Sequence, residues 1–538
     1  MSDPNNHTTV TNGAALQIDN WKTGGIIFVV GIAVWTLFLF FSPPRITSGD
    51  ITCFKDPGIN LAQGRGLVEI ITPGNPTLVP KFYANYPPLF PALYGIYVSQ
   101  FGVSAKADQL FDFFLASGAS ILFWFFVTPR YTSPRARIPC LILLGFLILM
   151  LPIGPFWTQR ERPDALGFIV MMASLWLARG ELSPKRIGLA AFVAGLGSLI
   201  SPFTFAMNGA ALGFLILLGG GPLVTFRGLR NRRFLKLTAA TCLGVIVPFA
   251  SLFLIQWLND PESVSRFTSN ALGKTTNGRA GVGYFSSLLA GDFKTYLGAF
   301  SRFDSIRYKW MLAHLVVVVG VTTLYLVATN LHSSSPRARW QPLALLALAA
   351  IPLLVFPYQP CYMSLTAAMV LILFALCKEP NTQPSEGSNQ WVPVIGVGFL
   401  ALVAAPFLFR EFVIAFQARD SYLKTTAMIQ RLNTGSDRSY HLVASSASSY
   451  FLFKQSGFEA VEIAYLQQPE DIARIDLFAF HAVAKGEDGG KRFPAWWDAD
   501  KMELVHLAES APDLKLFGIT LYRGRATWEP DLYRYKQP

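Results

Sequence analysis

The chain has 538 residues, of which 52% are hydrophobic and only 14% are charged, whereas soluble proteins average about 25% charged residues. Together with a mean hydropathy of +0.38, this composition excludes an ordinary water-soluble protein and predicts a membrane protein. The net charge of +12 does not indicate a nucleic-acid partner, because Lys and Arg occur in short clusters between apolar runs, as they do in cytoplasmic loops beside anionic lipids.

The N-terminal part of the chain predicts a short tail followed by a membrane anchor. Residues 1–21 are polar and rich in Asn and Thr, which is typical of a disordered cytoplasmic segment. The apolar run that follows, residues 24–41, is too long for a signal-peptide core and lacks a small-residue cleavage site. We therefore expect it to remain as the first transmembrane helix.

Further apolar runs are long enough to form helices across a hydrocarbon layer of ~30 Å. They lie at residues 109–127, 138–157, 164–179, 187–203, 204–219, 237–258, 310–329, 341–357, 361–377 and 391–409. With a cytoplasmic N-terminus, the basic short loops between them all fall in the cytoplasm, as the positive-inside rule requires. The pattern predicts an α-helical polytopic membrane protein with about eleven transmembrane helices and an extracytoplasmic C-terminus.

Loop charge also decides how two ambiguous segments are interpreted. Residues 187–219 are divided into two spans at Ser201-Pro202, because a single broken span would move the next basic loop to the outside. The apolar run 87–101 is interpreted as an interfacial or re-entrant helix, because a span there would move the basic loop 129–137 to the outside.

Beyond Arg410 the composition changes to that of a soluble domain. Short apolar runs alternate with helix-like stretches such as residues 469–474, which predicts a small α/β domain. The predicted organisation is a tail (1–21), a membrane domain (22–409) with outward loops at 42–108 and 259–309, and a soluble extracytoplasmic domain (410–538).

An ordered set of motifs follows the first predicted span. Asp50 lies a few residues beyond that span, where a partly desolvated carboxylate can act as a general base. An isolated loop Asp is more often a solvated turn residue, and the motifs downstream favour the functional interpretation. They are Asn60-Leu61-Ala62-Gln63-Gly64-Arg65-Gly66 and Tyr83-Ala84-Asn85-Tyr86-Pro87-Pro88-Leu89-Phe90-Pro91.

An acid after the first span, a helix that ends in Gly-x-Gly and a Tyr-Pro-Pro-Leu-(aromatic)-Pro motif resemble the polyprenyl-phosphate-sugar-dependent glycosyltransferases. These integral-membrane enzymes of the GT-C fold include the protein O-mannosyltransferases, the aminoarabinose transferases of lipid A and the rhizobial lipopolysaccharide transferases. The resemblance covers residues 22–180 by motif and the remainder by topology alone. It implies that Asp50 is the catalytic base and that Tyr86, beside the Pro-Pro pair, contributes to substrate binding.

The chain also departs from this family. Many members have Asp-Glu where this chain has Asp50-Ile51, and many have an acid or a His just before the Pro-Pro pair, where this chain has Asn85-Tyr86. The second acidic residue is therefore unassigned, as is a divalent cation that it would share. Asp56 and Glu69 are both candidates. The five cysteines have no metal-binding spacing, and no other cofactor is expected.

Charged residues at two other outward positions are the candidates for binding the donor. The short loop before span four contains Arg160, Glu161, Arg162 and Asp164. Two Arg and two acids at a membrane boundary can bind a lipid phosphate and orient its sugar, and a self-neutralising salt-bridge cluster is the alternative. The outward loop 259–309 contains further cations, namely Arg266, Lys274, Arg279, Lys294, Arg302, Arg307 and Lys309. Arg307 and Lys309, beside a predicted span, are the preferred substrate-binding residues among them.

These observations predict an inverting glycosyltransferase of the inner (plasma) membrane. Its partners would be a polyprenyl-phosphate-linked sugar donor, an acceptor protein, lipid or polysaccharide at the extracytoplasmic face, and the lipid bilayer. The alternatives are a transporter or flippase for a lipid-linked anionic glycan, and a non-catalytic assembly subunit. Transporters tend to place ionisable residues near the middle of the membrane, whereas the predicted spans here contain almost no charge and the acids lie at their outer ends.

Overall fold

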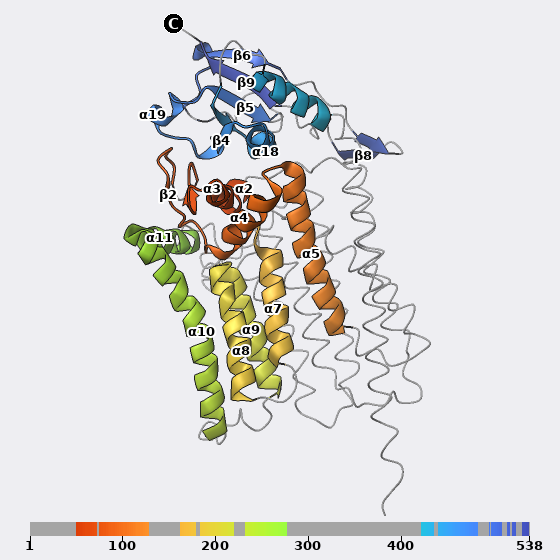
Figure 1. The fold of residues 1–538 in the computed structure, drawn as a ribbon, viewed down its shortest axis with the longest axis vertical. Coiled ribbons are helices and arrows are strands. Elements are labelled where there is room, and N and C mark those ends of the chain that lie inside the picture. The colour runs from red at the N-terminus through yellow and green to blue at the C-terminus, as the bar shows by residue number, and fades with distance from the viewer. Residues whose placement is uncertain are drawn as a thin grey trace, which may run out of the picture.

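The computed structural model describes residues 50–72, 75–127, 162–178, 183–219, 232–276, 421–434, 440–481, 494, 496–507, 514–516, 519–522 and 530–536. These residues form a bundle of long helices, a layer of shorter elements at one end of the bundle, and a sheet beyond that layer (Figure 1). We call the middle layer, residues 50–101, the cap, and residues 440–536 the C-terminal domain. The first predicted span and those at 138–157, 310–329, 341–357, 361–377 and 391–409 lie outside the described residues.

The helices of the bundle coincide with predicted spans. They are α5 (Ala105–Val127), α7 (Asp164–Ala178), α8 (Pro184–Gly195) with the short 3-10 helix η4 (Leu196–Leu199), α9 (Pro202–Gly219) and α10 (Arg232–Asn259). Residues 187–219 form two helices with the break at Ser201-Pro202 that the sequence predicted, and α9 begins at Pro202, where the proline ring suits the first turn of a helix. The total number of spans stays a prediction.

One helix of the described residues, Leu235–Asn259, is long and apolar enough to cross a membrane by length and composition. Only 11% of its apolar segment is buried inside the protein. Its exposed side chains include Leu243, Ile246, Leu254 and Trp257. A continuous exposed apolar face of this kind is unfavourable in water and favourable against lipid.

Small residues allow α8 and α10 to pack closely. A Cβ atom added at Gly244 of α10 would lie only 2.5 Å from the carbonyl oxygen of Gly188 in α8. Close backbone approach at small residues is typical of helix pairs in membranes, where apolar burial contributes little to association.

The cap contains three helices and a hairpin. They are α2 (Asp50–Phe54), α3 (Asp56–Ala62), β1 (Val68–Glu69), β2 (Lys81–Phe82) and α4 (Leu89–Phe101). With 13 residues, α4 is about 20 Å long and shorter than the hydrocarbon layer. It lies in the layer between the bundle and the sheet (Figure 1), as expected of a helix that does not cross the membrane. The α3–α4 crossing requires glycine, because a Cβ atom at Gly58 would lie 2.4 Å from the carbonyl oxygen of Pro91.

The C-terminal domain confirms the predicted α/β architecture. Its five strands have the order β4 (Glu459–Glu462), β3 (Leu442–Ser445), β5 (Leu477–His481), β9 (Pro530–Tyr535) and β6 (Met502–His506). β3 is parallel to β4 and β5, and β9 is antiparallel to β5 and β6. The helices α18 (Ala447–Gln455) and α19 (Pro469–Ile472) connect the parallel strands, and β7 (Leu514–Leu516) pairs with β8 (Ile519–Tyr522).

The cap and the C-terminal domain share one hydrophobic core. Phe54 and Phe90 of the cap and Phe111 of α5 belong to the same buried cluster as Tyr450 and Phe451 of α18. The C-terminal domain therefore lies directly on the cap, at the end of the bundle where α2 begins (Figure 1).

Candidate functional site

Three of the side chains predicted to bind substrate collect around Phe54, the last residue of α2. Arg162 Nε lies 3.0 Å from Asp164 Oδ2, and both side chains are buried. The Arg162 guanidinium also lies over the Phe54 ring, 5.4 Å from its centroid. The Tyr86 ring also packs against Phe54, and the two ring centroids lie 4.5 Å apart.

The predicted base belongs to the same helix. Asp50 is the first residue of α2 and precedes Phe54 by one helical turn. Asp50 is therefore one helical turn away from the residue that contacts Arg162 and Tyr86. The Asp50 side chain and the predicted site residues Arg160, Glu161, Arg307 and Lys309 lie outside the described part of the structure.

A buried ion triad fixes the junction between α2 and α3. Lys55 Nζ lies 2.6 Å from Asp108 Oδ1 and 2.7 Å from Asp112 Oδ1, and the lysine side chain is fully buried. Burial alone lowers the pKa of Lys55, but the two carboxylates outweigh it and raise the pKa above its ordinary value. Lys55 is therefore charged and ties the end of α2 to α5. The one sequence signal for this triad is the spacing of Asp108 and Asp112, which places both on one face of a helix.

Asp56, a candidate for the second acid, contacts the C-terminal domain. Its carboxylate accepts hydrogen bonds from the Tyr450 hydroxyl and from Asn60 Nδ2, the latter at 3.2 Å. Lys454 Nζ lies 3.6 Å away. Burial raises the pKa of Tyr450 well above its ordinary value, and the Asp56 charge adds to this effect. Asp56 thus lies in the contact between two domains.

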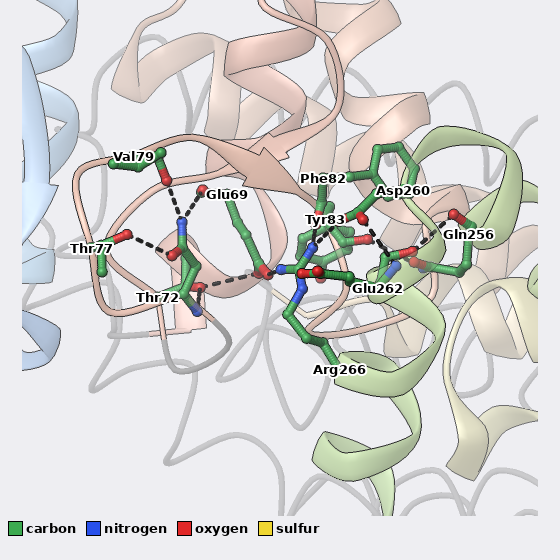
Figure 2. Close-up of polar contacts among 12 residues, drawn as sticks. Glu69, Thr72, Thr77, Val79, Phe82, Tyr83, Gln256, Asp260, Glu262 and Arg266 are labelled. Carbon is green, nitrogen blue, oxygen red and sulfur yellow. Dashed lines mark hydrogen bonds and ion pairs between the residues drawn. The ribbon is translucent and has the colours of Figure 1, made fainter.

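Glu69, the other candidate, contacts the amphipathic helix α11 (Pro261–Thr276), which follows α10 at the level of the cap (Figure 1). The Glu69 side chain is fully buried and accepts hydrogen bonds from Thr72 Oγ1 at 3.1 Å and from Arg266 Nη1 at 3.2 Å. Arg266 Nη2 donates to Phe82 O at 3.1 Å and to Asp260 Oδ2 at 2.5 Å (Figure 2).

Arg266 is the residue of this network that the sequence did not single out. It is one of several cations in the loop 259–309, and the loop pattern alone favoured Arg307 and Lys309. Its partner Glu69 lies 197 residues earlier in the chain, so no local spacing indicates the pair. The position of Arg266 in α11, immediately after a helix long and apolar enough to cross a membrane, was the available signal.

The described residues contain no group of three or more His, Cys, Asp or Glu side chains that could hold a metal ion. Asp56 and Glu69 each already contact a cationic side chain, Lys454 and Arg266 respectively.

No protein-family model and no curated protein matches the chain. Among solved structures, the chain is similar to ArnT from Cupriavidus metallidurans bound to undecaprenyl phosphate, with a TM-score of 0.53 and 12% sequence identity. The similarity covers 94% of this chain and 97% of that one. The Archaeoglobus fulgidus oligosaccharyltransferase also matches, with a TM-score of 0.48, 13% identity and coverage of 88% and 71%. The chain therefore has the GT-C-like fold that its motifs predicted.

Proposed function

We propose that the protein is a membrane glycosyltransferase that transfers a sugar from a polyprenyl-phosphate carrier to an acceptor hydroxyl, with inversion. One observation carries the proposal: in a chain with the GT-C fold, the helix that begins at Asp50 ends in the cluster of Arg162, Asp164 and Tyr86. A general base, a buried Arg and an aromatic ring at one end of the bundle suit transfer at a membrane surface.

In the proposed reaction, the Asp50 carboxylate removes the proton from the acceptor hydroxyl. The oxygen then attacks the anomeric carbon from the face opposite the phosphate. A new C–O bond forms as the bond from the anomeric carbon to the phosphate oxygen breaks, and the polyprenyl phosphate leaves with the bonding electrons. One displacement of this kind inverts the anomeric configuration.

The leaving phosphate gains negative charge, which a guanidinium can offset through paired N–H donors. Two described Arg residues at this end of the bundle support the proposal. Arg162 lies beside α2, and Arg266 lies on α11 directly after α10.

The proposed location is the inner (plasma) membrane, with the N-terminus in the cytoplasm and the site on the extracytoplasmic face. The support is the distribution of basic residues, which concentrate in the short loops on the opposite side. The contact between the cap and the C-terminal domain supports placing that domain in the compartment of the site.

The test is a transfer assay with the full chain reconstituted in lipid vesicles. Radiolabelled polyprenyl-phosphate sugars are supplied with candidate acceptors, and release of the polyprenyl phosphate is measured with sugar transfer. Asp50→Asn is expected to lose at least about a hundredfold in kcat, the size of a general-base contribution. Asp500→Asn, an exposed acid of the C-terminal domain, is the matched control and is expected to retain the wild-type rate.

Full activity of a folded Asp50→Asn protein would show that the assigned base is wrong. Movement of the intact labelled lipid between leaflets without cleavage would instead favour the flippase alternative. Neither cleavage nor movement with any donor would favour the assembly subunit.

A further inference from the structure

The segment between α3 and α4, residues 68–83, contacts three separate parts of the molecule. Its first contact is with the C-terminal domain. Ile71 is fully buried in the core of that domain, and Leu78 N donates a hydrogen bond to Asp471 Oδ2 at 3.1 Å. Ile71 has a φ of 49°, which a β-branched residue rarely adopts, so the surrounding contacts hold this backbone in place.

The second contact is with the outer end of α10 and with α11. Gln256 Nε2 donates to the carbonyl oxygen of Tyr83 at 3.2 Å, and Arg266 Nη2 donates to that of Phe82 (Figure 2). The Glu69–Arg266 ion pair joins the other strand of the hairpin to α11. The end of β2 and Tyr83, which follows it, are therefore held by α10 and α11.

The third contact is with α2. The Tyr83 side chain is fully buried, and its hydroxyl donates a hydrogen bond to the carbonyl oxygen of Cys53 at 2.7 Å. Burial raises the pKa of Tyr83 well above its ordinary value, so the hydroxyl keeps its proton and remains a donor. Cys53 belongs to the same single-turn helix as Asp50.

We propose that Tyr83 is a positioning residue that sets the place of Asp50 by fixing α2 to the segment held by α10, α11 and the C-terminal domain. This inference rests on the proposed function, in which Asp50 is the base. A base acts only within hydrogen-bond reach of the proton that it removes, and a displacement of about 1 Å can reduce the rate a hundredfold. Tyr83 itself contacts the helix and not the reacting atoms.

The test compares Tyr83→Phe with wild type in the reconstituted transfer assay. Phe keeps the buried ring and removes only the hydroxyl that reaches Cys53. We expect kcat to fall by about tenfold to a hundredfold, with little change in the KM for the donor. Tyr97→Phe is the matched control: Tyr97 lies in α4, and its buried hydroxyl has no hydrogen-bond partner among the described residues. Its kcat is expected to match wild type.

A double-mutant cycle separates positioning from a general loss of structure. Asp50→Glu lengthens the side chain by one methylene, so α2 would need a different position to bring the carboxylate to the same proton. If Tyr83 acts through Asp50, the fold-loss from Tyr83→Phe should differ at least about threefold between the wild-type and Asp50→Glu backgrounds. Gln256→Met removes the hydrogen bond from α10 to the carbonyl oxygen of Tyr83 and is also expected to lower kcat. It serves as the second variant if Tyr83→Phe does not fold.

Independent, multiplicative losses in the cycle would overturn the positioning role, as would a wild-type kcat for folded Tyr83→Phe. Failure of the proposed function has a different signature, because Asp50→Asn would then keep its activity whatever Tyr83 does.

Discussion

The hydroxyl of Tyr450 in α18 donates a hydrogen bond to the buried carboxylate of Asp56, the first residue of α3, although the two residues are 394 positions apart. The ammonium group of Lys454 lies 3.6 Å from the same carboxylate, and both of these charged side chains are nearly inaccessible. The C-terminal domain therefore contacts the cap through a buried charge pair, two residues after the end of α2.

This contact predicts that Asp56→Ala destabilises the attachment of the C-terminal domain. Removing the carboxylate leaves the Lys454 charge buried without its partner, which costs about 3–5 kcal/mol. The measurement is thermal unfolding of the detergent-solubilised protein together with limited proteolysis of the C-terminal domain. Asp500→Ala, which removes an exposed acid of the same domain, should leave both nearly unchanged, and an equal effect of the two variants would contradict the prediction.

The Lys55 triad predicts a large loss of stability in Lys55→Met. The Met side chain fills a similar volume, but Asp108 and Asp112 would be left as buried carboxylates without a cation, at a cost of about 3–5 kcal/mol. Thermal unfolding measures the loss. Adding Asp108→Asn and Asp112→Asn to Lys55→Met should recover part of it, because the unpaired charges are then gone. No recovery would mean that packing, and not charge, explains the effect.

The contact between Arg65 and Glu459 predicts a pH-dependent contribution to stability. The hydrogen bond from Arg65 lowers the pKa of Glu459 in the folded protein. The stabilisation is therefore present above the unfolded-state pKa of about 4.3 and is lost as the pH falls through the lower folded-state value. Both side chains are more than a third exposed, so solvent screening limits the contribution to about 0.5 kcal/mol.

Comparing the melting temperatures of wild type and Glu459→Gln across pH tests this directly. The small advantage of wild type should be present at neutral pH, disappear in acid and shrink at high salt. A difference that persists at a pH well below the folded-state pKa would show that the ion pair is not its source.

Close packing of α3 on α4 predicts that Gly58→Ala is destabilising. The added Cβ would lie 2.4 Å from Pro91 O and 2.9 Å from Gly95 N, and backbone atoms cannot move aside as a flexible side chain can. The helices must separate, at a cost of about 1–3 kcal/mol. Gly213→Ala in α9, where nothing lies within 4 Å of the added atom, is the control and should be neutral or slightly stabilising. Thermal unfolding compares the two.

The cation–π contact between Arg162 and Phe54 predicts that Arg162→Lys reduces activity even though the charge is retained. Lys lacks the planar guanidinium that both stacks on the ring and presents paired donors to a phosphate. We expect kcat/KM for the donor to fall by about tenfold, as for the loss of one charge-assisted contact. Initial rates in the transfer assay give the value, and Arg186→Lys in α8, at an exposed position, is the control. Equal rates for both variants would remove Arg162 from the site.

Much of the architecture could be predicted from the order of residues alone. Apolar runs predicted α7, α9 and α10, Ser201-Pro202 marked the break between α8 and α9, and short apolar runs predicted the strands β3 and β5. These features depend on length, periodicity and the geometry of proline, which act between residues that are near one another in the chain. The motif around Asp50 likewise indicated which end of the bundle to examine.

Only the tertiary structure decided which charged and polar side chains meet. Lys55 pairs with Asp108, Glu69 with Arg266, and Asp56 with Tyr450, across separations of 53, 197 and 394 residues. An ion pair depends on distance in space and on the exclusion of water, and neither quantity follows from spacing along the chain. The sequence therefore determined the helices of the bundle and the main strands, and the folded contacts decided which distant segments hold α2 in place.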